Sequence, residues 1–454
     1  MNIAGIVLAA GKGTRMKSEL PKVLHSVLGK KLIHYATDVI SDFEHKYVVV
    51  GHEADLVSNE LAKDITPVLQ STQKGTGHAV ATVLEHEQFN QFNHEYVVVI
   101  PGDVPLINKD SLHQLINEVK NNKASLGFFS SVSSNPFGYG RVVRDGESIS
   151  IVEEKDCSNE QRKINEINSG IYCFNADFLQ SNINQLSNAN AQGEIYLTDL
   201  IGIANNQKLD MVIVQVEEHS IQGINSMSQL NEVEDNLQKK LIQQFMDNGV
   251  YFQDPATTYL DESVTIASGS KIFANTHLKG DTSIGENCTI GPNAQISDSK
   301  IGNNTTVFNS VVDKSTVQAN GSIGPFAHLR PGSELSENVK VGAFAETKNS
   351  KIGPGSKVPH LAYVGDAELG ENVNFSAGAI TVNYDGANKH QTKIEDGAFI
   401  GSDVMLVAPV VIGKDAMIGA GSVITKDVPE KALGIERNNQ KNIEGYMDRK
   451  KRND

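Results

Sequence analysis

A glycine-rich turn near the N-terminus is the first stretch whose residue types could do chemistry. Residues 8–16 are LAAGKGTRM, directly after a short apolar run, and Pro21-Lys22 follows. Glycines at the end of a parallel strand let backbone amides approach an anion, and Arg15 and Lys22 would add fixed positive charge. The stretch has neither the GK[ST] of a P-loop nor the GxGxxG of a dinucleotide site. It predicts a phosphate cradle, although a tight turn with incidental basic residues explains the pattern equally well.

A single carboxylate stands at the end of a later apolar run. Asp103 lies in PGDVPL (101–106), after the Val/Ile-rich run at 95–101. The carboxyl ends of strands form the edge of an open α/β sheet where ligands bind, so Asp103 is a candidate ligand-binding group. A Gly-Asp pair more commonly caps the following turn. These residues alone leave both interpretations open.

One histidine in the C-terminal half is a candidate general base. His360 lies in HLAYVGDAE (360–368), which is not required by the repeat that surrounds it. Imidazole titrates near neutral pH and can therefore take a proton from an attacking nucleophile. A lone histidine is more often structural than catalytic, so its context must decide.

The elements that position His360 are predicted by a six-residue repeat. Helices repeat apolar residues every three or four positions and half-buried strands every second one, so a strict period of six fits neither. The spacing is typical of a hexapeptide parallel β-helix, whose coils point one branched aliphatic inward on each short side. A small or β-branched residue two positions earlier would fill the interior corner. The repeated aliphatics are Ile266, Ile272, Leu278, Ile284, Ile290 and Ile296, then Ile394, Ile400, Leu406, Ile412, Ile418 and Ile424.

The elements around the glycine-rich turn alternate between two types. Strands that alternate with helices predict a parallel, doubly wound, Rossmann-like α/β sheet. The expected strands are 3–10, 46–51, 95–101, 125–133, 141–152, 170–174 and 211–216, and the expected helices are 32–41, 54–63 and 76–87.

These patterns divide the chain into three parts. We expect an α/β domain over 1–226, a linker helix over 227–250 and an all-β repeat domain over 251–454. NYDGANK (383–389) interrupts the repeat, and loops on solenoids tend to carry binding groups. The end of the chain is expected to be a flexible tail that includes Arg449, Lys450, Lys451 and Arg452.

Composition limits the partners and the location. The 40 basic and 55 acidic residues give a net charge of −15, which argues against general affinity for nucleic acid or anionic membranes. Cys157, Cys173 and Cys288 are odd in number and form no CxxC pair, so we expect free thiols in a reducing compartment. With no signal peptide pattern and no apolar run of spanning length, the expected location is the cytosol.

The N-terminal motifs together resemble a known family. LAAGKGTRM followed by PK is similar to the signature of sugar-1-phosphate nucleotidyltransferases. QSTQKGTGHA (70–79) and PGDVPL resemble the uridylyltransferase half of the bacterial bifunctional GlmU family, whose members make UDP-N-acetylglucosamine. The resemblance continues through GYGR (138–141), VEEKD (152–156), EINSGIY (166–172) and GIN (223–225).

The resemblance implies roles for the residues in these motifs. Asp103 and Asn225 would hold Mg²⁺, which prefers oxygen ligands. Arg15 and Lys22 would help to neutralise charge as the sugar phosphate attacks the α-phosphorus of UTP and pyrophosphate leaves. The implied UTP and UDP-sugar contacts are Leu8, Ala9, Ala10, Gly11, Lys22 and Asn225, with Gln70, Gln73, Gly75 and Thr76 around the uracil and Gly138, Glu153 and Asn168 on the sugar.

The segments that the six-residue period does not require resemble the acetyltransferase half of the same family, which has a left-handed β-helix. They are LRPG (329–332), ETKNS (346–350), HLAYVGDAE, NVNFSAGA (372–379), NYDGANK and GSD (401–403). The resemblance implies that His360 takes a proton from the 2-amino group of glucosamine 1-phosphate as that nitrogen adds to the thioester of acetyl-CoA. Implied acceptor contacts are Arg330, Lys348, Tyr363, Asn374 and Lys389, and implied acetyl-CoA contacts are Asn383, Tyr384, Ser402, Ala420 and Arg437.

Two segments depart from the family pattern. SAGA at 376–379 replaces the more usual GAGT, and IERNNQ (435–440), which contains Arg437, differs from the segment that carries the cofactor-binding arginine. The role of Arg437 is therefore the prediction that these motifs support least.

These resemblances predict a bifunctional enzyme that acetylates glucosamine 1-phosphate and then couples the N-acetylglucosamine 1-phosphate to UMP from UTP. Hexapeptide acyltransferases resemble one another in being trimers, so we expect a homotrimer with acetylation sites between solenoids. Two alternatives stay open: a nucleotidyltransferase whose solenoid only regulates or oligomerises, and a non-catalytic assembly protein built from the same two folds.

Overall fold

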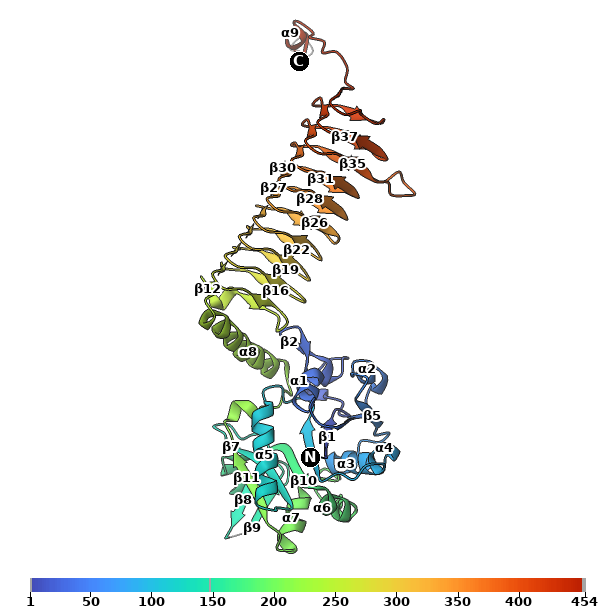
Figure 1. Cartoon of the computed structure of the whole chain (residues 1–454). Helices are drawn as coiled ribbons and strands as arrows, with labels where there is room; N and C mark the ends of the chain where they lie inside the picture. The colour runs from blue at the N-terminus through green and yellow to red at the C-terminus, as the bar shows by residue number, and fades with distance from the viewer. Residues whose placement is uncertain (1, 147, 451–454) are drawn as a thin grey trace. The chain divides into compact units, whose positions relative to one another are not determined.

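The computed structural model describes residues 2–146 and 148–450 of the chain (Figure 1). Contacts divide the chain into two compact units, with the boundary in the sequence between Asn236 and Leu237. The division falls inside helix α8 (Met227–Asp247), so the helix expected over 227–250 contributes to both units. None of the helices in the described residues has the length and apolar character needed to cross a membrane.

A twisted sheet forms the centre of the N-terminal unit. Its strand order is β11-β7-β10-β6-β1-β4-β5, and β10 runs antiparallel to both of its neighbours. The antiparallel β10 is a departure from the all-parallel sheet that alternation predicted, while the doubly wound class is confirmed. The strands are β1 (Ile3–Leu8), β4 (His45–Val50), β5 (Thr66–Leu69), β6 (Tyr96–Pro101), β7 (Leu126–Val132), β10 (Glu166–Asn175) and β11 (Met211–Gln215).

Helices cover both faces of this sheet, and a separate apolar core lies on each face. Along β6, Val98 and Ile100 join one core while Val97 and Val99 join the other, as the period of two in a strand requires. Helices α1 (Leu32–Val39) and α5 (Lys109–Asn121) contribute to the first core. Helices α3 (Thr76–Leu84), α6 (Ala176–Asn182) and α7 (Asp199–Asn206) contribute to the second. Shorter helices are α2 (Ala54–Ser58) and α4 (Glu87–Asn90).

The strand expected over 141–152 is two strands. β8 (Arg141–Asp145) and β9 (Ser148–Val152) pair antiparallel, with Arg141 opposite Val152. Gly146 has φ +62°, a conformation that suits glycine at the turn of the hairpin. The hairpin brings the end of β9 back beside the start of β8. A small separate hairpin pairs β2 (Ser26–Val27) with β3 (Lys30–Lys31).

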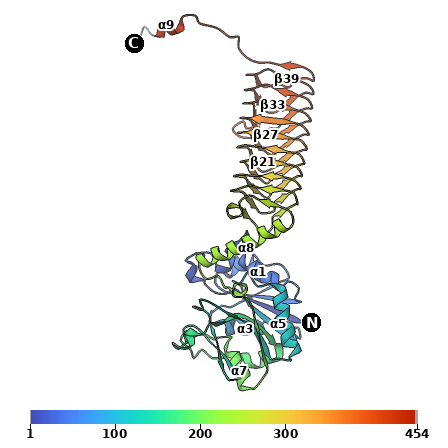
Figure 2. The same cartoon turned by 90° about the vertical axis from the view of Figure 1, so that its left-hand side faces the viewer.

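The C-terminal unit is a parallel β-helix, as predicted (Figure 2). Each coil adds one short strand to each of three sheets. Sheet I contains β12 (Tyr251–Phe252), β15 (Lys271–Ile272), β18 (Thr289–Ile290), β21 (Thr306–Val307), β24 (Ser322–Ile323), β27 (Lys340–Ala343), β30 (Lys357–His360), β33 (Asn374–Phe375), β36 (Phe399–Ile400), β39 (Met417–Ile418) and β41 (Leu433–Gly434). Sheet II contains β13 (Tyr259–Leu260), β16 (His277–Lys279), β19 (Gln295–Ser297), β22 (Val311–Asp313), β25 (His328–Leu329), β28 (Glu346–Lys348), β31 (Tyr363–Gly365), β34 (Ile380–Val382), β37 (Met405–Val407) and β40 (Val423–Ile424). Sheet III contains β14 (Thr265–Ile266), β17 (Ser283–Ile284), β20 (Lys300–Ile301), β23 (Thr316–Val317), β26 (Ser333–Leu335), β29 (Ser350–Ile352), β32 (Ala367–Leu369), β35 (Thr392–Ile394) and β38 (Val410–Ile412).

The repeated aliphatics fill the interior of the coils. Ile272 and Ile290 are opposite each other in adjacent strands of sheet I, and both are fully buried. Small residues fill the corners, as expected: the Ser270 hydroxyl donates to the carbonyl of Gly285 at 2.7 Å and accepts from the Cys288 amide at 2.9 Å. Such bonds satisfy polar groups that would otherwise be buried without partners.

The loop at 383–389 leaves the solenoid between β34 and β35, where Figure 1 shows it projecting from the coils. An antiparallel bridge joins Tyr384 to Lys389 across its neck. After β41 the described tail is exposed and ends with α9 (Tyr446–Lys450). The predicted basic tail residues Lys451 and Arg452 lie outside the described residues.

Truncating one repeated aliphatic should destabilise the solenoid. We expect Ile272→Ala to lower the free energy of unfolding of this unit by about 2–5 kcal/mol, because Ile272 is fully buried and its removal leaves a cavity. Lys271→Ala, at the exposed neighbouring position, should cost no more than about 0.5 kcal/mol. Scanning calorimetry of the full chain measures both, and equal losses would contradict the assigned core.

Candidate active sites

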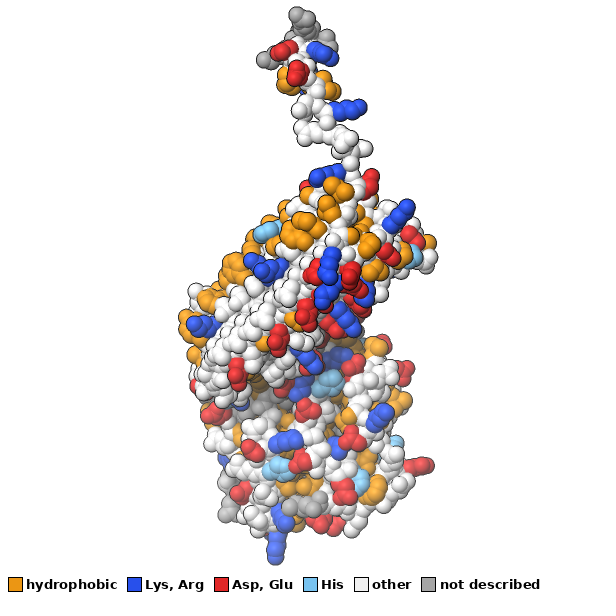
Figure 3. Space-filling model, turned by 45° about the horizontal axis from the view of Figure 1, so that its top comes forward, with side chains coloured by type: hydrophobic (Ala, Val, Ile, Leu, Met, Phe, Trp, Pro, Cys, Tyr) orange, Lys and Arg blue, Asp and Glu red, His pale blue; other side chains and the backbone are white. Residues whose placement is uncertain are grey.

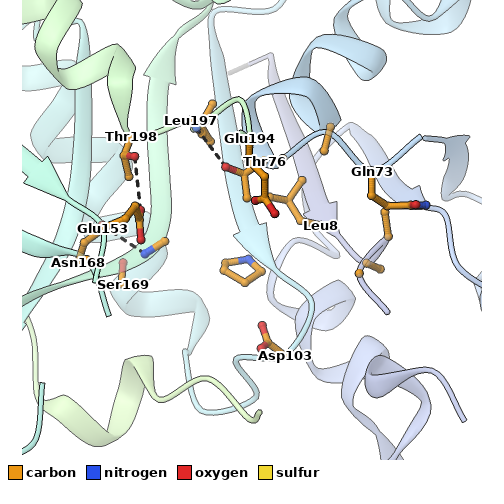
Figure 4. Close-up of a pocket in the computed structure, with 18 of the residues that line it drawn as sticks. Leu8, Gln73, Thr76, Asp103, Glu153, Asn168, Ser169, Glu194, Leu197 and Thr198 are labelled. Atoms are coloured by element: carbon orange, nitrogen blue, oxygen red, sulfur yellow. Dashed lines mark hydrogen bonds between the residues drawn. The ribbon is translucent and has the colours of Figure 1, made fainter. Parts of the chain in front are cut away.

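A cavity of about 740 Å³ lies at the carboxyl end of the central strands of the N-terminal unit (Figure 4). Its wall comes from the ends of β1, β6 and β10 and from the loops that follow β5 and β9. Thirteen of the residues predicted from motifs line it: Leu8, Ala9, Ala10, Gly11, Lys22, Gln70, Gln73, Gly75, Thr76, Asp103, Gly138, Glu153 and Asn168. The structure therefore gathers segments that are far apart in the sequence around one space large enough for a small ligand.

Four of the predicted charged and polar groups meet at one end of this space. The Lys22 ammonium forms an ion pair with Asp103 and donates to Asn225 Oδ1 at 3.0 Å. Arg15 Nη2 donates to the same Asn225 oxygen at 2.8 Å. Because oxygens of Asp103 and Asn225 converge on one compact cation, their donor set also suits a small metal ion. Within the described residues, no group of three or more His, Cys, Asp or Glu side chains could hold a metal.

Two glutamines and a glycine with a positive φ form another part of the wall. Gln70 is buried, donates to the Gly75 carbonyl at 3.2 Å and lies 2.8 Å from His78 Nδ1. Gly75 has φ +112°, and a side chain there would collide with the backbone of Ile195. The loop that contains Ile195 thus packs directly on the start of α3, where Leu197 donates its amide to Thr76 Oγ1 at 3.0 Å.

A half-buried carboxylate lies on the opposite wall, next to the end of β9. Glu153 accepts a hydrogen bond from the Thr198 hydroxyl at 3.4 Å, as Figure 4 shows. Burial raises the pKa of Glu153, and the nearby carboxylates of Asp156, Asp199 and Glu194 raise it further. Such a group is suited to hydrogen bonding with a neutral polyol.

Asn168, on β10, belongs to the same wall of the cavity as Glu153. Its side-chain amide donates to the Tyr172 hydroxyl at 2.6 Å, and its carbonyl oxygen accepts from the Gly170 amide at 3.3 Å. The pairing of β10 with β7 shifts between Asn168 and Tyr172. A local irregularity of this kind re-aims side chains, and here it directs Asn168 to the cavity.

Several residues of the cavity were not predicted from the motifs. Thr198 lies in the segment IYLTDL (195–200), and Glu194 directly precedes it. Tyr139 and Ser169 belong to the motifs GYGR and EINSGIY, in which Gly138 and Asn168 were the predicted contacts. Alternation of side chains along an extended segment offers no way to tell which member of such a motif faces a ligand. Arg15 and Asn225 contact the Lys22 group but do not line the cavity itself.

In the C-terminal unit, a cluster of cations lies on sheet II and its exit loop. Arg330 Nη1 pairs with Glu346 Oε1 at 2.8 Å, and Glu346 is opposite Tyr363 in the sheet. Lys348 ends strand β28 and lowers the pKa of Lys389, because the two ammonium groups are neighbours. Two adjacent cations held on a rigid strand and a pinned loop form a site suited to an anion.

The loop itself is fixed by polar contacts. Asn383 donates to the Asp366 carboxylate and lies 3.5 Å from the Tyr363 hydroxyl. The amides of Ala387 and Asn388 and the ring of His390 all bond to Asp385, and they lower its pKa. The Tyr384 hydroxyl donates to Gly386 O at 2.6 Å, which leaves the ring exposed.

Three of the remaining predicted residues, His360, Ser402 and Ala420, lie at the corner between sheets I and II. His360 is exposed at the end of β30, whereas Asn374 begins β33, the next strand of sheet I, opposite Lys357. Ser402 and Ala420 occupy this corner in later coils, where the Gly421 amide donates to Ser402 O at 2.8 Å. Arg437 Nη1 donates to Ala420 O at 3.0 Å, so this least supported residue still lies beside another predicted cofactor contact.

Comparison with known proteins agrees with both halves of the chain. Residues 5–146 match the MobA-like NTP transferase domain, residues 391–426 match six bacterial transferase hexapeptide repeats, and residues 260–364 match the GMPPB C-terminal domain. The "Bifunctional protein GlmU" of Carboxydothermus hydrogenoformans is 45% identical, over 98% of this chain and 99% of that protein. The GlmU proteins of Heliobacterium modesticaldum and Clostridioides difficile are 46% and 42% identical, over 98% and 100% of this chain and 98% and 99% of their own lengths.

The chain belongs to the GlmU family. Membership confirms the predicted bifunctional enzyme, in which a nucleotidyltransferase half precedes a hexapeptide acetyltransferase half. It also makes the two alternatives to a bifunctional enzyme the weaker interpretations. In this GlmU chain the first half contains the cavity, and the second contains the cation cluster and His360.

The environment of Glu153 predicts a pH-dependent stability. Because the folded chain raises its pKa, the folded state holds this proton more tightly than the unfolded chain does. The ionised carboxylate therefore reduces stability above its unfolded pKa of about 4.3, and the penalty disappears as the pH falls below that value. We expect Glu153→Gln to raise the Tm of the N-terminal unit at neutral pH and to leave it unchanged in acid.

Circular dichroism melts across the pH range test this expectation. Glu160→Gln is the matched control, because Glu160 is exposed and should give no such pH-dependent gain. A gain for Glu153→Gln that persisted unchanged into acid would contradict burial as the cause.

Proposed function

We propose that the chain transfers acetyl from acetyl-CoA to the amine of glucosamine 1-phosphate, and then uridylyl from UTP to the resulting N-acetylglucosamine 1-phosphate. The observation that carries this proposal is the presence of two separate sets of candidate site residues in one chain. The cavity gathers anion-binding, amide and carboxylate groups, while the solenoid presents a histidine and paired cations outside its core.

Uridylyl transfer needs the negative charge of the phosphates to be neutralised. Lys22 and Arg15 supply fixed charge at the end of the cavity where Asp103 lies. Asp103 and Asn225 would hold Mg²⁺ through their oxygens, with Lys22 turning from them toward phosphate. When bound, the ion supplies charge neutralisation at the reacting phosphates. The phosphate oxygen of the sugar attacks the α-phosphorus of UTP, and the bond to the leaving pyrophosphate breaks.

The rest of the cavity selects the two substrates. The amides and backbone around Gln70, Gln73, Gly75 and Thr76 can bond to both donors and acceptors of a pyrimidine edge. Glu153, Asn168 and the backbone at Gly138 face the opposite part of the space and would bond to sugar hydroxyls and the N-acetyl group. These two groups of residues are the basis for assigning UTP to the glutamine side of the cavity and the sugar phosphate to the Glu153 side.

Acetyl transfer needs a base and an anchor for the acceptor. His360 would take a proton from the 2-amino group as the nitrogen adds to the thioester carbon, and the thiol of CoA then leaves. Arg330, Lys348, Lys389 and Tyr363 would bind the phosphate, and a dianion between Lys348 and Lys389 would relieve their mutual repulsion. Asn374 would bond to the sugar, and Asn383, Tyr384, Ser402, Ala420 and Arg437 would contact acetyl-CoA.

An exposed apolar column supports the proposed homotrimer. Phe308, Phe326, Phe344 and Leu361 occupy the corner between sheets I and II in successive coils, and each is at least 42% exposed. The rings of Phe326 and Phe344 stack with centroids 5.1 Å apart. Large exposed apolar surface marks an interaction site, and this column ends beside His360. A second copy of the solenoid packed here would complete the acetylation site.

The chemistry also bears on location and on the alternatives. Cys157, Cys173 and Cys288 are buried free thiols, which suits the predicted cytosolic location of the enzyme. A solenoid that only regulates would need neither the paired cations on sheet II and its exit loop nor the exposed His360 on sheet I.

Substitutions at the two sites should separate the two activities. Asp103→Ala should lower pyrophosphate release at least about 100-fold and spare acetylation, because it removes the carboxylate at the charged end of the cavity. His360→Ala should lower thiol release about 100-fold or more and spare uridylyl transfer.

Parallel assays of free thiol and pyrophosphate on each variant test this separation. His277→Ala, near the start of the solenoid, is the matched histidine control and should retain both activities. Loss of both activities in either site variant would argue against independent sites, and unchanged thiol release in His360→Ala would refute its role as the base.

A charge in the apolar column should break the assembly. We expect Phe344→Asp to shift the sedimentation of the chain from a trimer to smaller species and to reduce acetylation while uridylyl transfer persists, because only the acetylation site needs a second solenoid. Glu368→Ala, on sheet III, should leave the trimer intact. A stable monomer that acetylates at full rate would refute the trimer.

A further inference from the structure

Arg141 is a buried cation that lies behind the wall of the N-terminal cavity and does not line it. Its residue is only 1% exposed, which makes it the largest fully buried side chain of the described residues. Burying a guanidinium costs several kcal/mol unless it is paired and hydrogen bonded. Arg141 begins β8, where its backbone is opposite Ile167 of β10 and Val152 of β9.

The contacts of Arg141 all lead to the sugar side of the cavity. Nη2 donates to Glu154 Oε2 at 2.7 Å, and Nη1 donates to the carbonyl of Tyr139. The same Glu154 oxygen accepts the amide of Gly138 at 3.2 Å. The guanidinium and the carboxylate thus hold both Gly138 and Tyr139, which line the cavity.

Glu154 also fixes the opposite edge of that wall. It directly follows Glu153 in the turn after β9. Glu153 lines the cavity, while the Glu154 carboxylate bonds to Arg141. The edges are close, because a side chain placed on Gly140 would lie 3.4 Å from Glu153 Oε1. Moving Glu154 therefore moves Glu153 and Gly138 relative to each other.

We propose that Arg141 and Glu154 form a positioning pair, which sets the separation between the Gly138 backbone and the Glu153 carboxylate and so determines binding of the sugar phosphate. The pair touches no substrate. Its effect falls on the sugar side, because none of its contacts reaches Gln70, Gln73 or the glycine-rich turn. The proposal rests on the assignment of Gly138 and Glu153 to the sugar.

Strand β8 offers a matched control. Arg144 bonds to Glu166 through Nε at 3.0 Å and Nη2 at 2.8 Å, but its side chain is 49% exposed and neither partner lines the cavity. An exposed pair of this kind contributes little to stability. Arg144→Met should therefore leave the kinetics of both reactions unchanged.

The test is the KM for each substrate of uridylyl transfer, measured by pyrophosphate release. The double variant Arg141→Met, Glu154→Gln removes both charges together, which avoids a buried charge without a partner. We expect its KM for N-acetylglucosamine 1-phosphate to rise about tenfold or more, with the KM for UTP within about twofold of the unmodified chain. Acetylation, measured as thiol release by the same preparation, should not change.

A second variant keeps the test decisive if the double variant does not fold. Glu154→Asp keeps the charge next to Arg141 but withdraws it from Gly138, and it should raise the same KM in the same direction. An unchanged KM for the sugar phosphate in a folded variant, or equal rises in both KM values, would overturn the proposal. Failure of the proposed function would look different, since the unmodified chain would then release no pyrophosphate.

Discussion

The ammonium group of Lys22 holds together oxygens from two residues that are 81 and 203 positions away in the sequence. No local element could make this contact, so the sheet, its crossover helices and the return of the chain to residue 225 are all needed to form it. The central strands end at one edge and place their following loops there. The chemistry of the N-terminal unit thus depends on a cation that the fold brings to two oxygen ligands.

In the solenoid, the residues that hold the fold together are separate from those at the candidate site. Its coils satisfy their own backbone groups by parallel pairing with the coils on either side, and its interior is filled by the repeated aliphatics. Side chains at the outward-facing positions therefore do not contribute to the packing of the core. Lys348, His360 and Tyr363 occupy such positions on strands, and Arg330 directly follows strand β25. These strands cannot move without breaking the stack. A rigid scaffold of this kind can hold a base and an anion site with little cost to its own stability.

The sequence predicted the parts of the structure that depend on local periodicity. The six-residue spacing predicted the solenoid because each short side of a coil buries one residue, and the alternating strands and helices predicted the N-terminal class. The antiparallel β10, and the division of 141–152 into a hairpin, depend on long-range pairing that no local pattern encodes. The burial of Arg141 could not be predicted either, because a charged residue in a strand is ordinarily exposed. Motifs identified most residues of the cavity, but not Glu194 and Thr198, which reach it only through the docking of a distant loop.

The order of the two reactions is the central claim, and one coupled measurement tests it most directly. The full chain is supplied with glucosamine 1-phosphate, UTP and Mg²⁺, and pyrophosphate and free thiol are followed before and after acetyl-CoA is added. The account predicts almost no pyrophosphate until acetyl-CoA is present, and then no more than one pyrophosphate for each thiol released. Rapid pyrophosphate release without acetyl-CoA, or no thiol release after its addition, would contradict it.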